Sequence, residues 1–151
     1  HYIKTEFMDC SRLNVLRRVE VHDLFMNNID KFQLIHEIDN YLFSHAGVYL
    51  DWTKKYEITL QELFDFKKFL GGRWDTLEDV SYTRGGWCKV GSCVWADIRE
   101  SVENELPVMF RQIVGHTQME SKPYITSRIA CLDVRQCFML DTKTHEINEI
   151  S

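Results

Sequence analysis

Apolar residues recur every three to five positions over residues 12–40, with charged residues between them. That spacing is typical of an amphipathic helix, so the sequence predicts helix in this segment. Residues 41–48 follow a different pattern, because an apolar run at 41–43 leads directly into Ser-His-Ala-Gly at 44–47. This pattern predicts a short strand that ends in a turn of small residues.

A second helix is predicted over residues 59–70. Thr59 and Glu62 have the spacing of a capping box, and apolar residues follow them at helical intervals. We expect the glycine pair at 71–72 to end this helix. Residues 71–93 hold five of the seven glycines and show little periodicity, so they are expected to form a long loop of the functional kind.

A third helix is expected over residues 96–106, ended by Pro107. The rest of the chain predicts strands, which we place at 111–114, 129–133, 137–140 and 146–150, the last two forming a closing hairpin. Helices come early and strands late, with one strand in the helical half. This order predicts a mixed α+β fold.

Composition narrows the class of protein. The 151 residues suit a single domain over 1–151, and a hydrophobic fraction of 44% with two prolines argues against disorder. The net charge of −5 disfavours nucleic acid as a partner, and no apolar run reaches the ~18 residues of a membrane span. Five cysteines without framework spacing favour a reducing, cytoplasmic compartment, and Cys88 and Cys93 lack the second pair of a thiolate zinc site.

Two histidines occur in the same local setting. His45 and His116 each follow a short apolar strand and have a glycine close by in the sequence. A strand end is a rigid mount, and small neighbours leave room for a metal ion or a phosphate. Neutral imidazole binds zinc, manganese and iron. The residues alone leave two interpretations open, metal ligands or hydrogen-bonded loop histidines.

At these residues the sequence resembles a known family. Phe-Ser-His-Ala-Gly-Val at 43–48 and Ile-Val-Gly-His-Thr at 113–117 resemble, in the right order, the "HAG" and "VGH" segments of calcineurin-like metallophosphoesterases. Val-Trp-Ala-Asp at 94–97 is similar to the family's "W-x-D" segment, and the final strands are also similar. The resemblance spans roughly residues 41–145. It is nearest to the phosphoprotein-phosphatase-like branch, which includes bacterial protein phosphatases and diadenosine tetraphosphate hydrolases.

The family's first motifs, D-x-H, G-D-x-x-D-R-G and G-N-H-D or G-N-H-E, do not occur in this sequence. In the bacterial relatives Leu-His often follows the last of them, and the pair His1-Tyr2 fits the position just beyond it. We therefore expect the C-terminal portion of a larger catalytic domain with the family's four-layer α/β/β/α sandwich. A half-length protein that lost these motifs is the alternative.

The resemblance implies a metal-dependent phosphoesterase that hydrolyses phosphate monoesters with a hydroxide held by two divalent ions, manganese, iron or zinc. His45 and His116 would ligate the same ion. The other ligands and the catalytic acid would lie in the missing N-terminal half, so no catalytic residue is expected in this chain. The implied partners are a phosphorylated substrate and that missing half, and this chain alone is expected to hydrolyse little.

Further candidates lie between the two histidines. Arg84, in the glycine-rich loop, is a candidate phosphate-binding residue because a guanidinium can hold two phosphoryl oxygens. Asp97 is expected to cap the third helix. Trp74 and Trp87 are candidates for the wall of a substrate cleft. Two other functions stay open, namely a non-catalytic binding or regulatory module on the same scaffold and an unrelated α+β domain.

Overall fold

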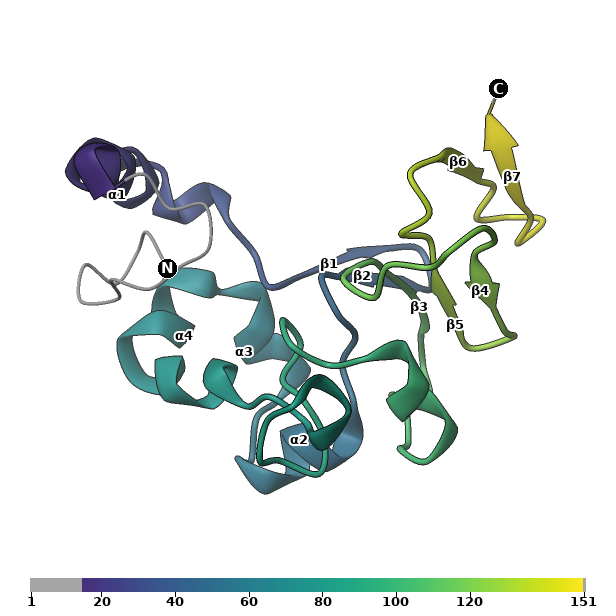
Figure 1. The fold of residues 1–151 in the computed structure, drawn as a ribbon, viewed down its shortest axis with the longest axis horizontal. Coiled ribbons are helices and arrows are strands. Elements are labelled where there is room, and N and C mark those ends of the chain that lie inside the picture. The colour runs from purple at the N-terminus through teal and green to yellow at the C-terminus, as the bar shows by residue number, and fades with distance from the viewer. Residues whose placement is uncertain (1–14, 151) are drawn as a thin grey trace.

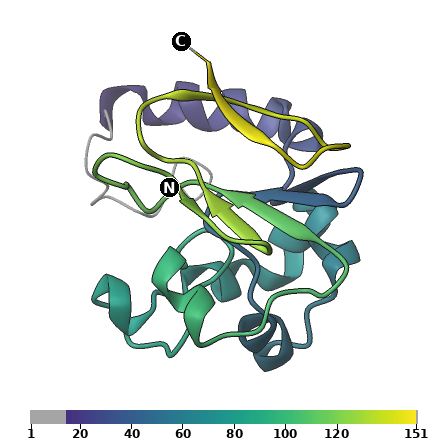
Figure 2. The same cartoon turned by 90° about the vertical axis from the view of Figure 1, so that its right-hand side faces the viewer.

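A five-stranded mixed sheet forms the centre of the computed structural model, which describes residues 15–150. Helices α2, α3 and α4 lie on one side of this sheet, and α1 and the C-terminal hairpin β6–β7 lie on the other side (Figures 1 and 2). The fold is therefore mixed α+β, as the order of the predicted elements indicates.

The elements within residues 15–150 are four α-helices, five short 3₁₀ helices and seven strands. The α-helices are α1 (Arg18–Asn27), α2 (Leu50–Lys55), α3 (Leu60–Phe64) and α4 (Phe66–Arg73). The 3₁₀ helices are η1 (Val15–Arg17), η2 (Ile29–Lys31), η3 (Trp74–Glu78), η4 (Tyr82–Arg84) and η5 (Ile98–Val102). The strands are β1 (Ile35–Ile38), β2 (Tyr41–Ser44), β3 (Arg111–Val114), β4 (Tyr124–Ile125), β5 (Ile129–Cys131), β6 (Cys137–Leu140) and β7 (Ile147–Ile150).

The strand order β1-β2-β3-β5-β4 determines where the chain's loops meet. The three central strands β2, β3 and β5 are parallel, whereas β1 and β4 run antiparallel at the two edges. Because parallel strands end at the same edge of a sheet, the loops after β2, β3 and β5 lie next to one another. All three helices α2–α4 belong to the long connection between β2 and β3.

The core fills the space between the sheet and these helices. Leu42 on β2, Trp52 on α2 and Leu63 on α3 are all fully buried in it. Buried Gln112 on β3 pairs with both backbone groups of Val48, donating to its carbonyl and accepting from its amide at 2.8 Å each. Because both polar ends of Gln112 are satisfied, burial of this amide is tolerated. The pairing fixes the segment after β2 against β3.

The capping box at Thr59 and Glu62 is confirmed. The helix that follows is shorter than predicted, because the Asp65 side chain accepts from the amide of Lys68 and starts α4 as a new helix. The glycine pair at 71–72 lies inside α4, so the prediction that it ends the helix is wrong.

Two further helix predictions are wrong in part. Residues 35–38 of the segment predicted as helix form β1, because β2 offers them a hydrogen-bonding partner, and residues 12–14 lie outside the described part. The third helix is only the short η5, because the Asn104 side chain donates to the Glu100 carbonyl and closes its end. Helix α2 and strand β4 were not predicted, and η3 and η4 lie within the predicted loop. The four predicted late strands are confirmed, as is the β6–β7 hairpin.

Candidate functional site

The loops after the three parallel strands carry the candidate residues. His45 follows β2 directly, His116 comes two residues after β3, and Asp133 comes two residues after β5. The backbone amide of Gly115 donates to the carbonyl of His45 at 3.0 Å, which joins the first two loops. The topology of the sheet therefore gathers two histidines and a carboxylate at one edge.

The structure brings His45 and His116 into direct contact. Nε2 of His45 lies 2.8 Å from Nδ1 of His116, and the ring centroids are 4.6 Å apart. Trp95 packs edge-on against the His116 ring at a centroid distance of 5.6 Å. The sequence predicted that these two histidines act together, and their side chains do meet.

The backbone of His116 is held in an unusual conformation. Its φ of 63° lies in the left-handed region, which costs free energy for a residue with a side chain. Nη2 of Arg84 donates to the carbonyl of His116 and to Oγ1 of Thr117, both at 3.0 Å. The Cys131 thiol donates to the carbonyls of Gly115 and Thr117. These contacts fix the loop that aims His116 at His45.

Both rings are neutral at neutral pH. Burial, and then the charges of Arg84 and His45, lower the pKa of His116 to about 4. Burial also lowers the pKa of His45, although the charge of Asp133 works in the opposite direction. A neutral imidazole nitrogen offers a lone pair, which is the form that binds metal ions.

The geometry of the pair fits two ligands of one metal ion. Two nitrogens bound at ~2.0–2.1 Å with an angle near 90–110° at the metal would lie roughly 2.9–3.4 Å apart. The observed separation of 2.8 Å is close to this range. Nε2 of His116 is buried without a hydrogen-bond partner among the described residues. The site thus holds two nitrogen atoms side by side that could bind one ion once both carry a lone pair.

These two ligands do not make a complete metal centre. Across residues 15–150, no three His, Cys, Asp or Glu side chains are grouped as metal ligands. Cys93 offers no thiolate, since burial raises the pKa of its thiol to about 12. A stable site for such an ion needs three or four protein ligands, and the described residues bring two together here.

Arg84, the candidate phosphate-binding residue, lies beside the two histidines, and its side chain already contacts other groups of the protein. In addition to the contacts with His116 and Thr117, its Nε lies 3.0 Å from Oδ2 of Asp97. Asp97 also accepts two hydrogen bonds from the Arg99 side chain. Burial alone would raise the pKa of Asp97, but the hydrogen bonds from Arg99 and the charges of Arg84 and Arg99 keep it below its ordinary value.

Asp97 has the structural role that the sequence predicted. Its side chain accepts from the amide of Arg99 at the start of η5, and Glu100 completes a capping box with it. Its position also places a buried carboxylate between Arg84 and Arg99. The ion pairs therefore connect η5 with the loop that holds His116.

An apolar cavity of about 670 Å³ opens beside the histidine pair. Trp74 contributes to its wall, as predicted, whereas Trp87 lies 90% exposed and lines a different depression. Phe32, Phe66 and Trp95 complete the aromatic part of the wall. The two tryptophans thus line different depressions, and only Trp74 lies in the cavity next to the histidine pair.

Sequence reasoning missed Asp133 and Trp95 as site residues, although both lie in segments that carry the family resemblance. Comparison of the chain with protein-family models, curated proteins and solved structures finds no match. Within the described residues, none of the helices combines the length and apolar character needed to cross a bilayer.

Proposed function

We propose that this chain is the C-terminal portion of a calcineurin-like metallophosphoesterase that hydrolyses phosphate monoesters. The observation that carries the proposal is the contact between Nε2 of His45 and Nδ1 of His116 at 2.8 Å. Two nitrogens from the loops after adjacent parallel strands lie close enough to bind one ion once both carry a lone pair. The order of the "HAG", "W-x-D" and "VGH" segments along the chain supports the same family.

Two divalent ions, manganese, iron or zinc, would supply an activated hydroxide and neutralise charge on the phosphoryl group. The chain's own residues would hold one of these ions through His45 and His116. Arg84 would keep the His116 loop in place, and its positive charge beside the pair would favour an approaching phosphate. A phosphate-binding role for Arg84 stays a prediction, since Nη2 already has two protein acceptors.

The remaining ligands and the catalytic acid would come from an N-terminal segment with the D-x-H, G-D-x-x-D-R-G and G-N-H motifs. The apolar cavity beside His45 and His116 is where that segment would pack, because the cavity opens directly next to the two proposed ligands. Its strands would add the second sheet of a four-layer α/β/β/α sandwich.

A non-catalytic binding or regulatory module on the same scaffold is the second candidate function. The observation that favours it is the count of ligands, since the described residues offer two histidine nitrogens and no third ligand grouped with them. In this case the cavity would still receive a partner, but no phosphate ester would be hydrolysed.

The test is to express the chain together with the coding sequence that precedes His1 in its source DNA. We expect manganese-dependent hydrolysis of p-nitrophenyl phosphate, and we expect the His45→Ala and His116→Ala variants to lose both activity and one bound ion. The His36→Ala variant serves as the control, because His36 is exposed and its ring contacts Gln33. Full activity and metal content in both site variants would overturn the proposal. An upstream sequence without the three motifs would favour the binding module.

A further inference from the structure

Asp133 lies at the edge of the sheet where the two histidines meet. It follows β5, and β5 pairs in parallel with β3, the strand that precedes His116. The amide of Met119 donates to the carbonyl of Asp133 at 2.8 Å, and the Cys131 thiol donates to the carbonyl of Thr117 at 3.2 Å. These hydrogen bonds fix the backbone of Asp133 against the loop that carries His116.

The packing around Gly115 brings Asp133 close to the loop of His45 as well. A Cβ atom added at Gly115 would lie 3.9 Å from the carbonyl oxygen of His45 and 4.0 Å from Cβ of Asp133, so both residues pack against the same glycine. The electrostatics agree with this packing. Burial lowers the pKa of both His45 and His116, and the negative charge of Asp133 opposes that effect on both rings.

The carboxylate of Asp133 has no partner among the described residues. Two carboxylates, those of Asp97 and Asp133, act on the His116 ring through their charge. Asp97 is already paired with Arg84 and with Arg99. The carboxylate of Asp133, by contrast, makes no hydrogen bond and no ion pair within residues 15–150, although the residue is partly buried. A negative charge without a cation therefore lies beside the histidine pair.

A divalent ion held by His45 and His116 needs a negative charge nearby. Both rings are neutral ligands, and the positive charge of Arg84, which after burial also lowers the pKa of both rings, would repel a cation. Moving an ion from water into a partly buried site costs free energy, and a nearby opposite charge offsets that cost. The described residues form no group of three metal ligands, so a carboxylate here would act through its charge and not through a direct bond.

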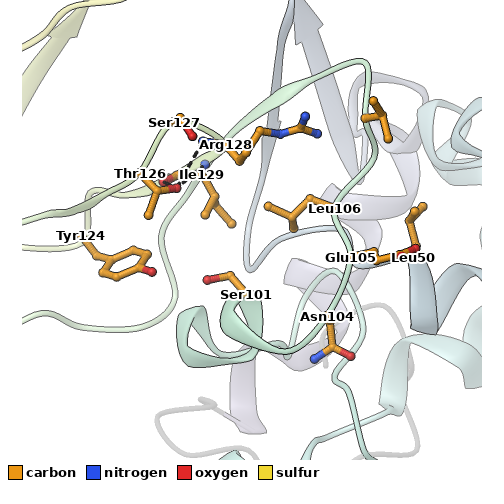
Figure 3. Close-up of a pocket in the computed structure, with 11 residues that line it drawn as sticks. Leu50, Ser101, Asn104, Glu105, Leu106, Tyr124, Thr126, Ser127, Arg128 and Ile129 are labelled. Atoms are coloured by element: carbon orange, nitrogen blue, oxygen red, sulfur yellow. Dashed lines mark hydrogen bonds between the residues drawn. The ribbon is translucent and has the colours of Figure 1, made fainter.

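The opposite end of the strands offers no comparable charge. A pocket of about 510 Å³ opens there, beside the turn that precedes β5 (Figure 3). Glu105, the acidic residue in its lining, lies 3.1 Å from the ammonium group of Lys54, and Arg128 contributes a positive charge to the same lining. Of these two regions, the unpaired carboxylate thus belongs to the edge with the histidines.

We propose that Asp133 is the counter-charge of the ion site, whose carboxylate attracts the divalent ion that His45 and His116 hold. This inference rests on the proposed function, because the ion comes from it, and it adds a residue to the site. An attraction across space weakens as salt is added, whereas a packing contact does not. Asp133→Asn keeps the shape of the side chain and removes its charge, and Asp133→Glu keeps the charge. Salt and these two variants therefore separate an electrostatic role from a structural one.

Manganese titration of the 151-residue chain, followed by NMR, tests the proposal. Manganese(II) is paramagnetic, so even weak binding broadens the ring signals of His45 and His116, which are assigned from the His45→Ala and His116→Ala variants. We expect Asp133→Asn to weaken manganese binding by about tenfold at about 0.01 M salt and by about twofold at about 0.5 M salt. Asp133→Glu should bind manganese within about threefold of the parent chain, because its charge is retained.

Glu146→Gln is the matched control, because it removes an exposed negative charge far from the site. The adjacent residue, His145, has its Nδ1 2.9 Å from the hydroxyl of Tyr41, which begins β2, whereas His45 follows the end of that strand. We expect this variant to bind manganese as the parent chain does.

Equal manganese binding by Asp133→Asn and the parent chain overturns the inference. A loss that high salt does not reduce, or that Asp133→Glu does not restore, also overturns it, as does an absence of broadening in the parent chain. The histidine variants show whether the proposed function fails too. Manganese binding that both His45→Ala and His116→Ala leave unchanged removes the ion site itself, whereas failure of the Asp133 results alone leaves the histidine pair as the proposed ligands.

Discussion

Nε2 of His45 and Nδ1 of His116 are joined by a single hydrogen bond, so one of the two atoms carries a proton and the other a lone pair. A metal ion between them needs a lone pair on both atoms. The donating ring must therefore transfer its proton to its other nitrogen before an ion can bind. In the proposed metal site, an ion would take the place of the proton that the two nitrogen atoms share in this hydrogen bond.

The first prediction concerns metal binding by this chain alone. We expect isothermal titration calorimetry with zinc to show weak binding of one ion, since the described residues group two histidine ligands and no third. His45→Ala and His116→Ala should each reduce the affinity by at least about tenfold. His36→Ala should leave it unchanged. Unaltered binding in both site variants would show that the ion is held elsewhere.

The second prediction concerns Arg84, which holds the His116 loop. Replacing Arg84 by Met removes two hydrogen bonds and leaves buried Asp97 with one cation, so the free energy of unfolding should fall by about 2 kcal/mol. Urea unfolding measures this loss, and amide exchange should become faster at residues 115–117. Arg99→Met is the matched control, because Arg99 pairs with the same carboxylate from a side chain that is 68% exposed.

For Arg99→Met we expect less than half of the loss and no change in exchange at residues 115–117. The comparison separates the effect of Arg84 on the His116 loop from the stability that any cation beside Asp97 would provide. Equal losses in the two variants would contradict that role.

The features that the sequence predicts well are those that depend on neighbours in the chain. The capping box of Thr59 and Glu62 involves residues three apart, and the late strands are bounded by turn residues. The family resemblance implied that His45 and His116 ligate the same ion, and the structure brings their side chains into contact. Equivalent positions at the ends of adjacent parallel strands lie close together. Two histidines that follow β2 and β3 can therefore contact each other although they are 71 positions apart in the sequence.

The features that it predicts poorly depend on partners distant in the chain. Ile35 and Ile38 are three positions apart, which fits one face of a helix, but pairing with β2 makes this segment a strand in which Ile35 is buried and Ile38 is exposed. Asp133 reaches the site only because β5 pairs with β3, a register that no local pattern reveals.

The third prediction is a pH dependence of stability that arises from Asp97. Its folded pKa lies below the ordinary value of 3.8, so the carboxylate stabilises the fold above that pH. This stabilisation is lost as the pH falls through the folded pKa. At pH 7 the Asp97→Asn variant should be less stable by about 3 kcal/mol, because Arg84 and Arg99 lose their buried counterion.

Urea unfolding of both proteins between pH 7 and pH 3 measures the difference in free energy. We expect a constant difference near neutrality that shrinks as the pH falls below about 4. Asp30→Asn is the control, since the pair of Asp30 with Lys67 is exposed, and its difference should stay near zero throughout. If the difference in unfolding free energy between the parent protein and Asp97→Asn grew toward acid pH, the lowered pKa of Asp97 would be contradicted.

The last prediction uses two glycines with opposite surroundings. Gly72 lies inside α4 with no atom near the position of an added Cβ, so Gly72→Ala should stabilise the protein by about 0.5–1 kcal/mol through helix propensity. At Gly86 the added Cβ would overlap the backbone carbonyl of Val80, and the amide of Gly86 donates to the carbonyl of Ser81. Since backbone must move, Gly86→Ala should cost about 2 kcal/mol or more. Thermal unfolding of the two variants gives the signs directly, and a destabilised Gly72→Ala variant would contradict the placement of residues 71–72 within a helix.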